Sequence, residues 1–214
     1  LDGTPFDWIQ HQSLAFDTEA RDPRFAKTIL ANGANFLGQT IETFIGGRNG
    51  KPQSGATPTS YYLRKFLREE TSLITGNETS YQHIVPLFRI EEVLLNYAEA
   101  LVEAKKDPNF TGIVDDINYI LSPLDAVNLV RGRVGMPDIS VGIDYNTFIK
   151  RLRNERRVEL AFEGHRFWDI RRWMIGEETS SVYGLSILYQ SSGAQTVNRV
   201  LVQKREWNDK MYYY

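Results

Sequence analysis

Apolar residues in the middle of the chain recur three or four positions apart, which is the spacing of an amphipathic helix. The first such run extends from Pro86 to about Lys105, and the pair Asp107-Pro108 ends it. Lys105 and Lys106 suit a helix C-terminus because their charge complements the negative end of the helix dipole. The side chains expected to face the core are Leu87, Ile90, Leu94, Tyr97 and Leu101, with Val93 and Ala98 alongside.

A second helix is predicted to start after Ser122. Pro123 takes its first position, and Asp125 follows three residues after the capping serine. Gly135, placed just before Met136-Pro137, predicts the end of this helix, because glycine adopts the left-handed conformation and proline cannot continue a helix. The inner stripe of the helix consists of Leu124, Val127 and Val130.

A third helix is predicted from about residue 145 to residue 162, and its apolar face carries charge. The residues that share this face are Phe148, Leu152, Glu155, Glu159 and Glu163, with Ile149 and Arg156 beside them. Carboxylates on the buried side of a helix are costly unless they are paired and hydrogen-bonded. The arginines that follow Gly164 can supply bidentate partners. We therefore expect an internal ion-pair lattice formed by Glu155, Arg156, Glu159, Glu163, Arg166, Asp169, Arg171 and Arg172.

The rest of the chain is less regular. A short helix is predicted over residues 166–174, with Phe167, Trp168, Ile170 and Trp173 packing inward. Residues 1–60 combine glycines, prolines and scattered aromatics without a sustained period, which indicates long ordered loop with a short helix or turn opening at residues 22–25. Residues 182–189 and 196–202 are candidates for short strands. The predicted fold class is therefore mainly α, built from helical pairs of a tetratricopeptide-like kind with a little irregular β.

Composition narrows the class of protein. A chain of 214 residues with 42% hydrophobic and 24% charged residues forms a folded core, and no apolar run approaches the roughly 20 residues that span a bilayer. The net charge of -2 argues against a general polyanion binder. Because the chain has no cysteine, disulfides and thiolate chemistry are excluded. The sequence starts at Leu1 without an initiator methionine or a basic-then-apolar leader, so either a leader has been removed or the chain is a piece of a longer protein, and we favour the second interpretation.

Four segments in this order resemble the SusD/RagB family of glycan-capture lipoproteins. They are residues 22–24 (DPR), 86–100 (PLFRIEEVLLNYAEA), 126–137 (AVNLVRGRVGMP) and 153–173 (RNERRVELAFEGHRFWDIRRW). The resemblance covers roughly residues 20–175 and corresponds to the C-terminal part of such proteins. The family's tetratricopeptide-like N-terminal half, leader, lipid-bearing cysteine and proline-rich closing segment have no counterpart in this sequence. We expect residues 1–214 to form one SusD-like domain with a loop-rich segment at 1–60, a helical core at 84–175, and loops or short strands at 176–214.

The resemblance also implies a function. Members of this family bind oligosaccharides or polysaccharides without catalysis, need no cofactor, and act as a lid over a SusC-like TonB-dependent transporter. The resemblance therefore implies a surface location at the outer membrane, with membrane contact only through a lipid anchor that lies outside this chain.

Other chemistries fit parts of the sequence. Glu155 and Glu159 permit a glycosidase hypothesis, since two carboxylates about 5 to 9 Å apart can act as acid and nucleophile or base. Surrounding arginines would instead hold both carboxylates ionised, which favours structural ion pairing over catalysis. Arginines interleaved with aromatics also resemble a nucleic-acid surface, but paired arginines leave no basic excess for that partner. A protein-interaction scaffold that binds no sugar stays open as well.

The sequence does not indicate a metal site or a phosphate-binding loop. The three histidines, His11, His83 and His165, lack the i, i+4 spacing of a zinc site. Residues 46–51 (GGRNGK) lack the spacing of a phosphate-binding loop and the Ser or Thr that follows it. We predict no metal site.

Sugar recognition calls for aromatic side chains on loops, because a sugar ring stacks its C–H face on an aromatic ring while planar polar groups bind the hydroxyls. The loop-rich segment before the family's helices offers such residues. The candidate ligand-binding residues are Trp8, Phe36, Phe44, Tyr61 and Tyr62, with Asn35, Gln39, Arg48 and Asn49.

Overall fold

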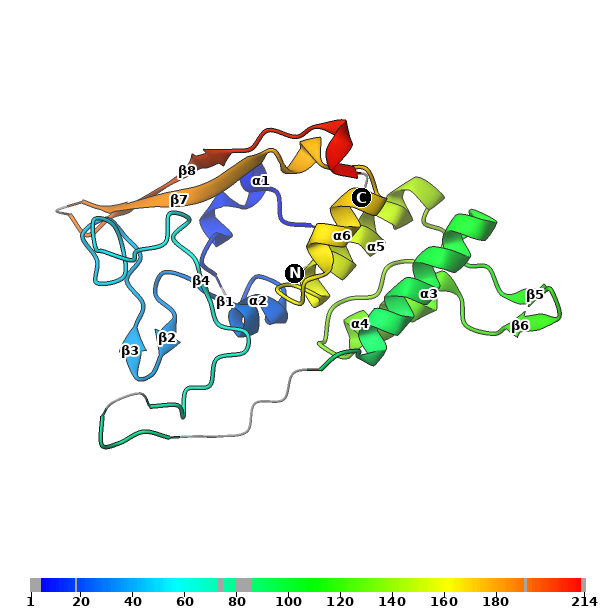
Figure 1. Ribbon diagram of the computed structural model, residues 1–214, viewed down its shortest axis with the longest axis horizontal. Helices are drawn as coiled ribbons and strands as arrows, with labels where there is room; N and C mark the ends of the chain where they lie inside the picture. The colour runs from blue at the N-terminus through cyan, green and yellow to red at the C-terminus, as the bar shows by residue number, and fades with distance from the viewer. Residues whose placement is uncertain (1–4, 18, 73–74, 80–85, 191, 213–214) are drawn as a thin grey trace. The chain divides into compact units, whose positions relative to one another are not determined.

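The computed structural model describes residues 5–17, 19–72, 75–79, 86–190 and 192–212. Within these ranges it contains six α-helices, short 3-10 helices and paired strands (Figure 1). Helices α3, α4 and α5 are the longest, and most of the strands are only two or three residues long. The expectation of a mainly α fold with a little irregular β is confirmed.

The chain divides into two compact units that alternate along the sequence. Unit 1 consists of residues 1–11, 18–24 and 83–163, and unit 2 consists of residues 12–17, 25–82 and 164–214. Unit 1 contains helix α1 (Trp8–His11) and the three long helices, whereas unit 2 contains helix α6 and most of the strands. Helix α2 (Pro23–Thr28) runs across the boundary at residue 24.

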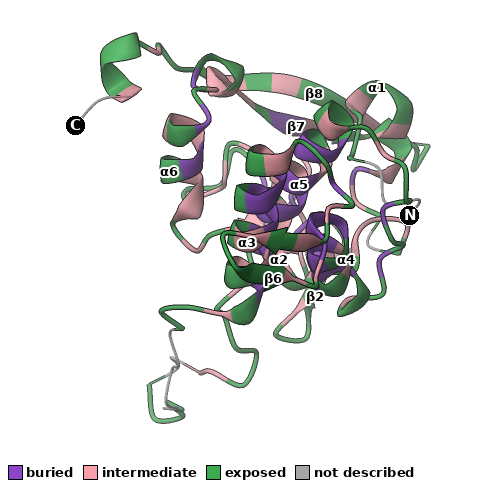
Figure 2. Cartoon of the chain, turned by 90° about the vertical axis from the view of Figure 1, so that its right-hand side faces the viewer, coloured by how far each residue is buried: buried purple, intermediate pink, exposed green. Residues whose placement is uncertain are grey.

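Three helices form the core of unit 1: α3 (Ile90–Lys105), α4 (Pro123–Gly132) and α5 (Tyr145–Glu159). All three pack against one another, and the buried positions gather on their inner faces (Figure 2). A hairpin of β5 (Gly112–Val114) and β6 (Ile117–Tyr119) connects α3 to α4. Each fully buried large apolar side chain contributes about 1.5–3 kcal/mol to stability. The best buried of them are Leu95, Val102, Leu124, Val127, Val130, Phe148 and Leu152.

Local sequence signals account for the helix starts in this unit. The Ser122 hydroxyl accepts a hydrogen bond from the backbone N–H of Asp125 at 3.0 Å, and Pro123 is the first residue of α4, as predicted. The Asp144 carboxylate caps α5 in the same way by accepting from the Thr147 N–H at 3.0 Å. The predicted helix ends are less accurate. Helix α4 ends at Gly132 rather than near Gly135, and α5 ends at Glu159 rather than at residue 162.

The predicted inner face of α3 needs a correction. Ala98 and Leu101 are buried as predicted, and Leu94 and Tyr97 pack against the core. Leu95 and Val102, which were not predicted to face the core, are fully buried, whereas Ile90 and Val93 are 64% and 53% exposed. Leu87 precedes the helix and is also exposed. The reason is that α3 contacts both α4 and α5, so the residues between these two neighbours are buried, and this stripe lies one position further along the helix than the periodicity predicts.

A long antiparallel hairpin organises unit 2. Its strands are β7 (Ser181–Tyr189) and β8 (Gln195–Lys204), with an irregularity in register between Val182 and Tyr183. The strand candidates at 182–189 and 196–202 are therefore confirmed as one hairpin. The segment at residues 59–60 lies along β7, because the Leu185 N–H donates to the Thr59 carbonyl at 3.1 Å and the Ser60 hydroxyl donates to the Leu185 carbonyl at 2.8 Å.

Short strand pairs order the loops of unit 2. Strand β1 (Ile29–Leu30) pairs with β4 (Tyr62–Leu63), and β2 (Asn35–Phe36) pairs with β3 (Gln39–Thr40). The Ile45 N–H also donates to the Ile187 carbonyl of β7 at 2.9 Å. Two further 3-10 turns, Glu177–Thr179 and Asp209–Tyr212, flank the hairpin in sequence.

Helix α6 (His165–Arg172) presents its aromatics differently from the prediction. Trp173, which caps the helix, is buried, but Phe167 and Trp168 are 50% and 55% exposed. Asp169 is the buried residue within the helix itself. A helix of eight residues can bury only one of its sides, so it cannot bury every large side chain. In α6 the buried side carries Asp169, and the adjacent Phe167 and Trp168 lie on the exposed side.

Candidate functional site

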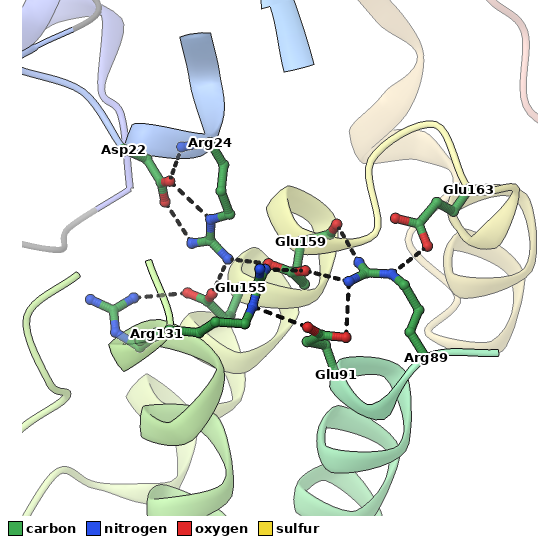
Figure 3. A network of polar contacts seen from close by, with 9 residues as sticks. Asp22, Arg24, Arg89, Glu91, Arg131, Glu155, Glu159 and Glu163 are labelled. Atoms are coloured by element: carbon green, nitrogen blue, oxygen red, sulfur yellow. Dashed lines mark hydrogen bonds and ion pairs between the residues drawn. The ribbon is translucent and has the colours of Figure 1, made fainter. Parts of the chain in front are cut away.

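Three glutamates of the 153–173 block lie in a network of ion pairs within unit 1 (Figure 3). Glu155 and Glu159 lie on α5 and are 1% and 3% exposed, and Glu163 follows the helix. Their acidic side chains point at guanidinium groups from three other segments of the unit. The arginines in this network are Arg24, Arg89, Arg131 and Arg133.

Arg24 bridges the two buried carboxylates. Its Nη1 lies 2.5 Å from Glu155 Oε1 and 2.8 Å from Glu159 Oε2. Asp22 holds the other side of the same guanidinium, since Arg24 donates from Nε to Asp22 Oδ1 at 2.9 Å and from Nη2 to Asp22 Oδ2 at 2.6 Å. Such a two-point contact fixes the plane of the guanidinium. Asp22 therefore orients Arg24 toward α5.

Arg89 approaches Glu159 from the segment just before α3. It donates from Nη1 to Glu159 Oε1 at 2.7 Å and from Nη2 to the Glu159 carbonyl at 2.9 Å. Its Nε donates to Glu163 Oε2 at 2.8 Å. Arg89 consequently ties the start of α3 to the end of α5.

Arg131 and Arg133 complete the network from the end of α4. Arg131 Nη1 donates to Glu155 Oε2 at 2.9 Å and is itself 4% exposed. Arg133 Nη2 donates to Glu159 Oε1 at 2.8 Å and its Nε lies 3.0 Å from Glu91 Oε1 on α3. Each buried carboxylate thus meets at least two guanidiniums, as the cost of burying its charge requires.

The charges of this network shift its pKa values. Burial alone raises the pKa of the Glu159 carboxyl, but hydrogen bonds from Arg24 and Arg89 outweigh it and hold that pKa below its ordinary value. The pKa of Asp22 is lowered in the same way, because the hydrogen bonds and charge of Arg24 outweigh burial. Burial lowers the pKa of the Arg24 guanidinium, but its hydrogen bonds to Asp22 and Glu155 have the larger effect, so the pKa is raised above its ordinary value. A carboxylate held ionised in this way is a poor general acid, because a glycosidase needs one carboxyl with a raised pKa.

The arginines of the block itself have other contacts. Arg156 donates to Asn96 Oδ1 at 2.7 Å, and Arg172 pairs with Asp169 at 2.9 Å within α6. Arg171 donates to the Phe167 carbonyl at 3.0 Å and lies 3.5 Å over the Phe167 ring. Arg166 also lies on α6, in unit 2. The partners described above for Glu155 and Glu159 therefore come from residues distant in sequence, whereas the prediction assigned them to the arginines that follow Gly164.

The sugar-binding candidates fall in both units. Trp8 lies on α1 in unit 1 and is half-buried. The other candidates lie in unit 2, on β2, β3, β4 and the adjoining loops: Asn35, Phe36, Gln39, Phe44, Arg48, Asn49, Tyr61 and Tyr62. Their role in ligand binding stays a prediction.

Two of these candidates use their polar groups to hold the loops together. The Tyr61 hydroxyl donates to the Ala15 carbonyl at 3.1 Å, and the Tyr62 hydroxyl donates to the Asn49 carbonyl at 2.7 Å. Arg48 Nη1 donates to Gln39 Oε1 at 3.0 Å, and Arg48 Nη2 lies 3.6 Å from Glu42 Oε1. Among the candidates, Arg48 and Gln39 are thus the exposed planar polar groups already brought together.

Phe44 has an aromatic partner that the sequence does not indicate. Its ring meets the ring of Tyr189 at a centroid distance of 4.7 Å and an angle of 77°. Tyr189, at the end of β7, is 50% exposed. The hydrogen bond between Ile45 and Ile187 fixes the loop against the strand, and this places the two rings together. Because Phe44 and Tyr189 are far apart in sequence, no local signal could have paired them.

The part of the chain that the structure describes shows no group of three or more His, Cys, Asp or Glu side chains arranged to hold a metal ion. His83 lies outside the described residues. Across these same described residues, no helix combines the length and the apolar character needed to cross a bilayer.

Comparison with known proteins identifies the class. A profile of the SusD family matches residues 5–214, so the chain belongs to the SusD family. A curated relative, SusD-like protein P2 of Formosa agariphila, is 34% identical over 110 residues, which are 51% of this chain and 20% of that protein. The chain therefore spans about a fifth of the length of this relative.

One solved structure agrees with this assignment over nearly the whole chain. The crystal structure of a SusD-like protein from Bacteroides fragilis superposes with a TM-score of 0.73 at 27% identity, covering 99% of this chain and 38% of that one. A SusD homolog from Bacteroides thetaiotaomicron has a TM-score of 0.48 at 24% identity, covering 80% and 33% of the two chains. Proteins of this family are generally non-catalytic, glycan-binding proteins of nutrient uptake.

Proposed function

We propose that this chain is part of a non-catalytic protein that captures oligosaccharides or polysaccharides at the cell surface. The observation that carries this proposal is the match to the SusD family over residues 5–214. Glycan capture for import through a SusC-like TonB-dependent transporter, and lipid anchoring at the outer membrane, belong to the same proposal because they are the setting in which this family works.

The buried carboxylates support binding over hydrolysis. Glu155 and Glu159 each contact at least two arginines and are 1% and 3% exposed, so neither is placed to donate a proton to a sugar oxygen. The pKa of Glu159 is lowered rather than raised, which is the opposite of what an acid catalyst needs. We therefore propose that these glutamates stabilise the helical core and that recognition takes place elsewhere.

The candidate for sugar contact in unit 2 is the aromatic pair Phe44 and Tyr189. The two rings meet edge to face, and Tyr189 is half exposed, so part of its side chain is accessible to a ligand. Arg48 and Gln39 belong to neighbouring parts of the same loop region and offer planar donors and acceptors for hydroxyls. The pair is held by backbone hydrogen bonds, which lowers the entropy cost of binding.

Affinity electrophoresis of the 214-residue chain in native gels that contain different polysaccharides tests the proposal. We expect retardation by at least one polysaccharide and no release of reducing ends. Tyr189→Ala should reduce the retardation, whereas Tyr183→Ala should not, because Arg199 covers the Tyr183 ring at 3.6 Å on the same hairpin. Release of reducing ends that Glu159→Gln abolishes would establish a hydrolase instead. Retention of a partner protein without any retardation by polysaccharide would establish a protein-interaction scaffold.

A further inference from the structure

Unit 2 contains an open groove of about 500 Å³ that lies apart from the aromatic pair at Phe44. It forms where the chain leaves β4 and turns back beside α2. Ligand pockets commonly have volumes of about 300–1,000 Å³, so the groove can hold one or two sugar rings. The residues that line it are Lys27, Arg64, Lys65, Phe66, Leu67, Arg68, Glu69 and Glu70.

The lining of the groove is basic although the chain is not. It has four cationic side chains and two carboxylates, which leaves a net charge of +2, whereas the whole chain has a net charge of -2. Arg64 forms an ion pair with Glu69, and this pair adds no net charge. Lys27, Lys65 and Arg68 supply the other positive charges of the lining, and Glu70 supplies its other carboxylate. Lys65 and Arg68 also take part in interactions within the protein, and Lys65 Nζ lies 5.8 Å from the centre of the Phe66 ring. A concave surface with an excess of one sign of charge attracts ligands of the opposite sign.

Phe66 adds an aromatic surface to these cations. Its side chain is 41% exposed, and the neighbouring Leu67 is 52% exposed. The backbone of Phe66 has a φ of 72°, a left-handed conformation that a bulky aromatic residue rarely adopts. Residues held in such conformations are found preferentially at binding sites, where the surrounding structure imposes them.

Backbone hydrogen bonds impose this conformation. The N–H groups of Arg64 and Lys65 both donate to the Thr28 carbonyl, at 2.9 and 3.2 Å, and the Leu67 N–H donates to the Arg64 carbonyl at 2.9 Å. The turn is therefore fixed to the end of α2, and Phe66 is kept at the lining of the groove. A ring that is already positioned loses little entropy when a ligand stacks on it.

We propose that this groove binds an acidic saccharide, one whose rings carry carboxylate or sulfate groups. Phe66 contacts the apolar face of a sugar ring, while Lys27, Lys65 and Arg68 bind its anionic groups. Apolar contact and positive charge together fit an acidic sugar better than a neutral one. The proposal rests on the glycan-binding function proposed above and specifies the class of glycan.

Isothermal titration of the 214-residue chain with three probes of matched length tests the proposal. The probes are an oligogalacturonate, a sulfated dextran oligosaccharide and a neutral malto-oligosaccharide. We expect at least one acidic probe to bind about tenfold more tightly than the neutral probe in about 20 mM salt, and this advantage to shrink in about 300 mM salt. A comparison of the two acidic probes distinguishes a carboxylate from a sulfate preference.

Two variants assign the binding to the groove. The double variant Lys27→Gln and Arg68→Gln should weaken binding of the acidic probe about tenfold, whereas Lys204→Gln with Arg205→Gln, exposed on and just after β8, should leave it unchanged. Phe66→Asn should also weaken binding and keep the fold, because asparagine tolerates the left-handed conformation. Circular dichroism checks that each variant is folded.

The outcomes separate this inference from the proposed function. Equal affinity for neutral and acidic probes, unchanged in the groove variants, overturns the groove assignment and leaves glycan binding in place. Failure to bind any saccharide in either the titrations or the native gels overturns the proposed function itself. Binding of a single-stranded RNA homopolymer or of anionic lipid vesicles as tightly as the acidic saccharide, lost in the same groove variants, overturns the choice of a saccharide as the ligand.

Discussion

Arg24 Nη1 and Glu159 Oε2 lie 2.8 Å apart although 135 residues separate them in the sequence. Arg24 is the final residue of an early stretch of unit 1, and Glu159 is the final residue of α5. Both side chains are buried, and Arg24 contacts Glu155 at the same time. This ion pair therefore fixes residues 22–24 to the helical core, and its removal should lower the stability of the folded chain.

Replacing Arg24 by methionine should lower the free energy of unfolding by about 3 kcal/mol, because removing one partner of a buried ion pair leaves uncompensated charge. Arg131 and Arg89 would still contact the two glutamates, which limits the loss. Urea denaturation followed by circular dichroism measures the change.

Arg48→Met is the matched control. The Arg48 side chain is 55% exposed and its ion pair with Glu42 is 3.6 Å long, so this variant should change stability by less than about 0.5 kcal/mol. Equal effects of the two variants would contradict a structural role for the network.

Acid should destabilise unit 1 through the same network. The pKa values of Asp22 and Glu159 are lowered in the folded protein, so both carboxyls bind protons more readily when unfolded. Their contribution to stability is complete above the unfolded pKa values, roughly 4, and is lost as the pH falls through the folded ones. The melting temperature should therefore decrease steadily as the pH falls below about 5. Asp22→Asn should flatten this decrease while lowering stability at neutral pH.

The control for this pH series is Asp116→Asn, which removes the same charge from the exposed turn between β5 and β6. Asparagine readily adopts the φ of 62° found there. This variant should keep the acid sensitivity of the parent chain. A melting temperature that is constant or higher in acid would contradict the linkage.

Glycine is required at position 184 for the packing of residues 58–59 against β7. A Cβ at Gly184 would lie 2.5 Å from the Thr59 Cα and 2.9 Å from the Pro58 carbonyl oxygen. Because these are backbone atoms, Gly184→Ala must displace the segment, at a cost of about 1–3 kcal/mol.

Gly132, the last residue of α4, provides the comparison for Gly184. Among the described residues, no atom beyond the helix's own backbone and the adjacent residues lies within 4 Å of the position that a Cβ would take at Gly132. Gly132→Ala should therefore be neutral or stabilising by up to about 1 kcal/mol. Thermal denaturation of the two variants compares them directly, and similar losses at both positions would contradict the steric argument.

Ser122 should contribute to stability through its cap on α4. Ser122→Ala removes the acceptor for the Asp125 N–H and should cost about 1 kcal/mol. Ser140→Ala, at an exposed position outside the helices, provides the comparison and should have almost no effect. Urea denaturation of both variants measures the difference. A loss at Ser140 as large as that at Ser122 would show that the cap is not the cause.

The features that could be predicted from sequence are those encoded by neighbouring residues. The start of α4 follows from Ser122, Pro123 and Asp125, and the charged face of α5 follows from the helical spacing of Glu155 and Glu159. Each of these signals spans only a few positions, so one sequence is sufficient to detect it. The four segments that indicate the SusD family are likewise local patterns.

Contacts between distant segments could not be predicted in the same way. Sequence indicates that a buried glutamate needs a guanidinium but not which one, and the partners of Glu159 include Arg24, Arg89 and Arg133, which lie outside the block that contains this glutamate.

The aromatic residues illustrate the same limit. The size and apolar character of Phe167 and Trp168 predict that they pack inside, yet a short helix can bury only one side. The sugar-binding residues stay a prediction, since ring geometry such as that of Phe44 and Tyr189 depends on tertiary packing.

The alternation of the two units along the chain limits how this protein can be dissected. A fragment that began at residue 83 would include all of α3, α4 and α5 but would lack Asp22 and Arg24. Glu155 would then keep Arg131 but lose its second guanidinium. Residues 83–163 expressed alone are therefore expected to form an unstable product, and supplying residues 18–24 as a separate peptide should restore its stability.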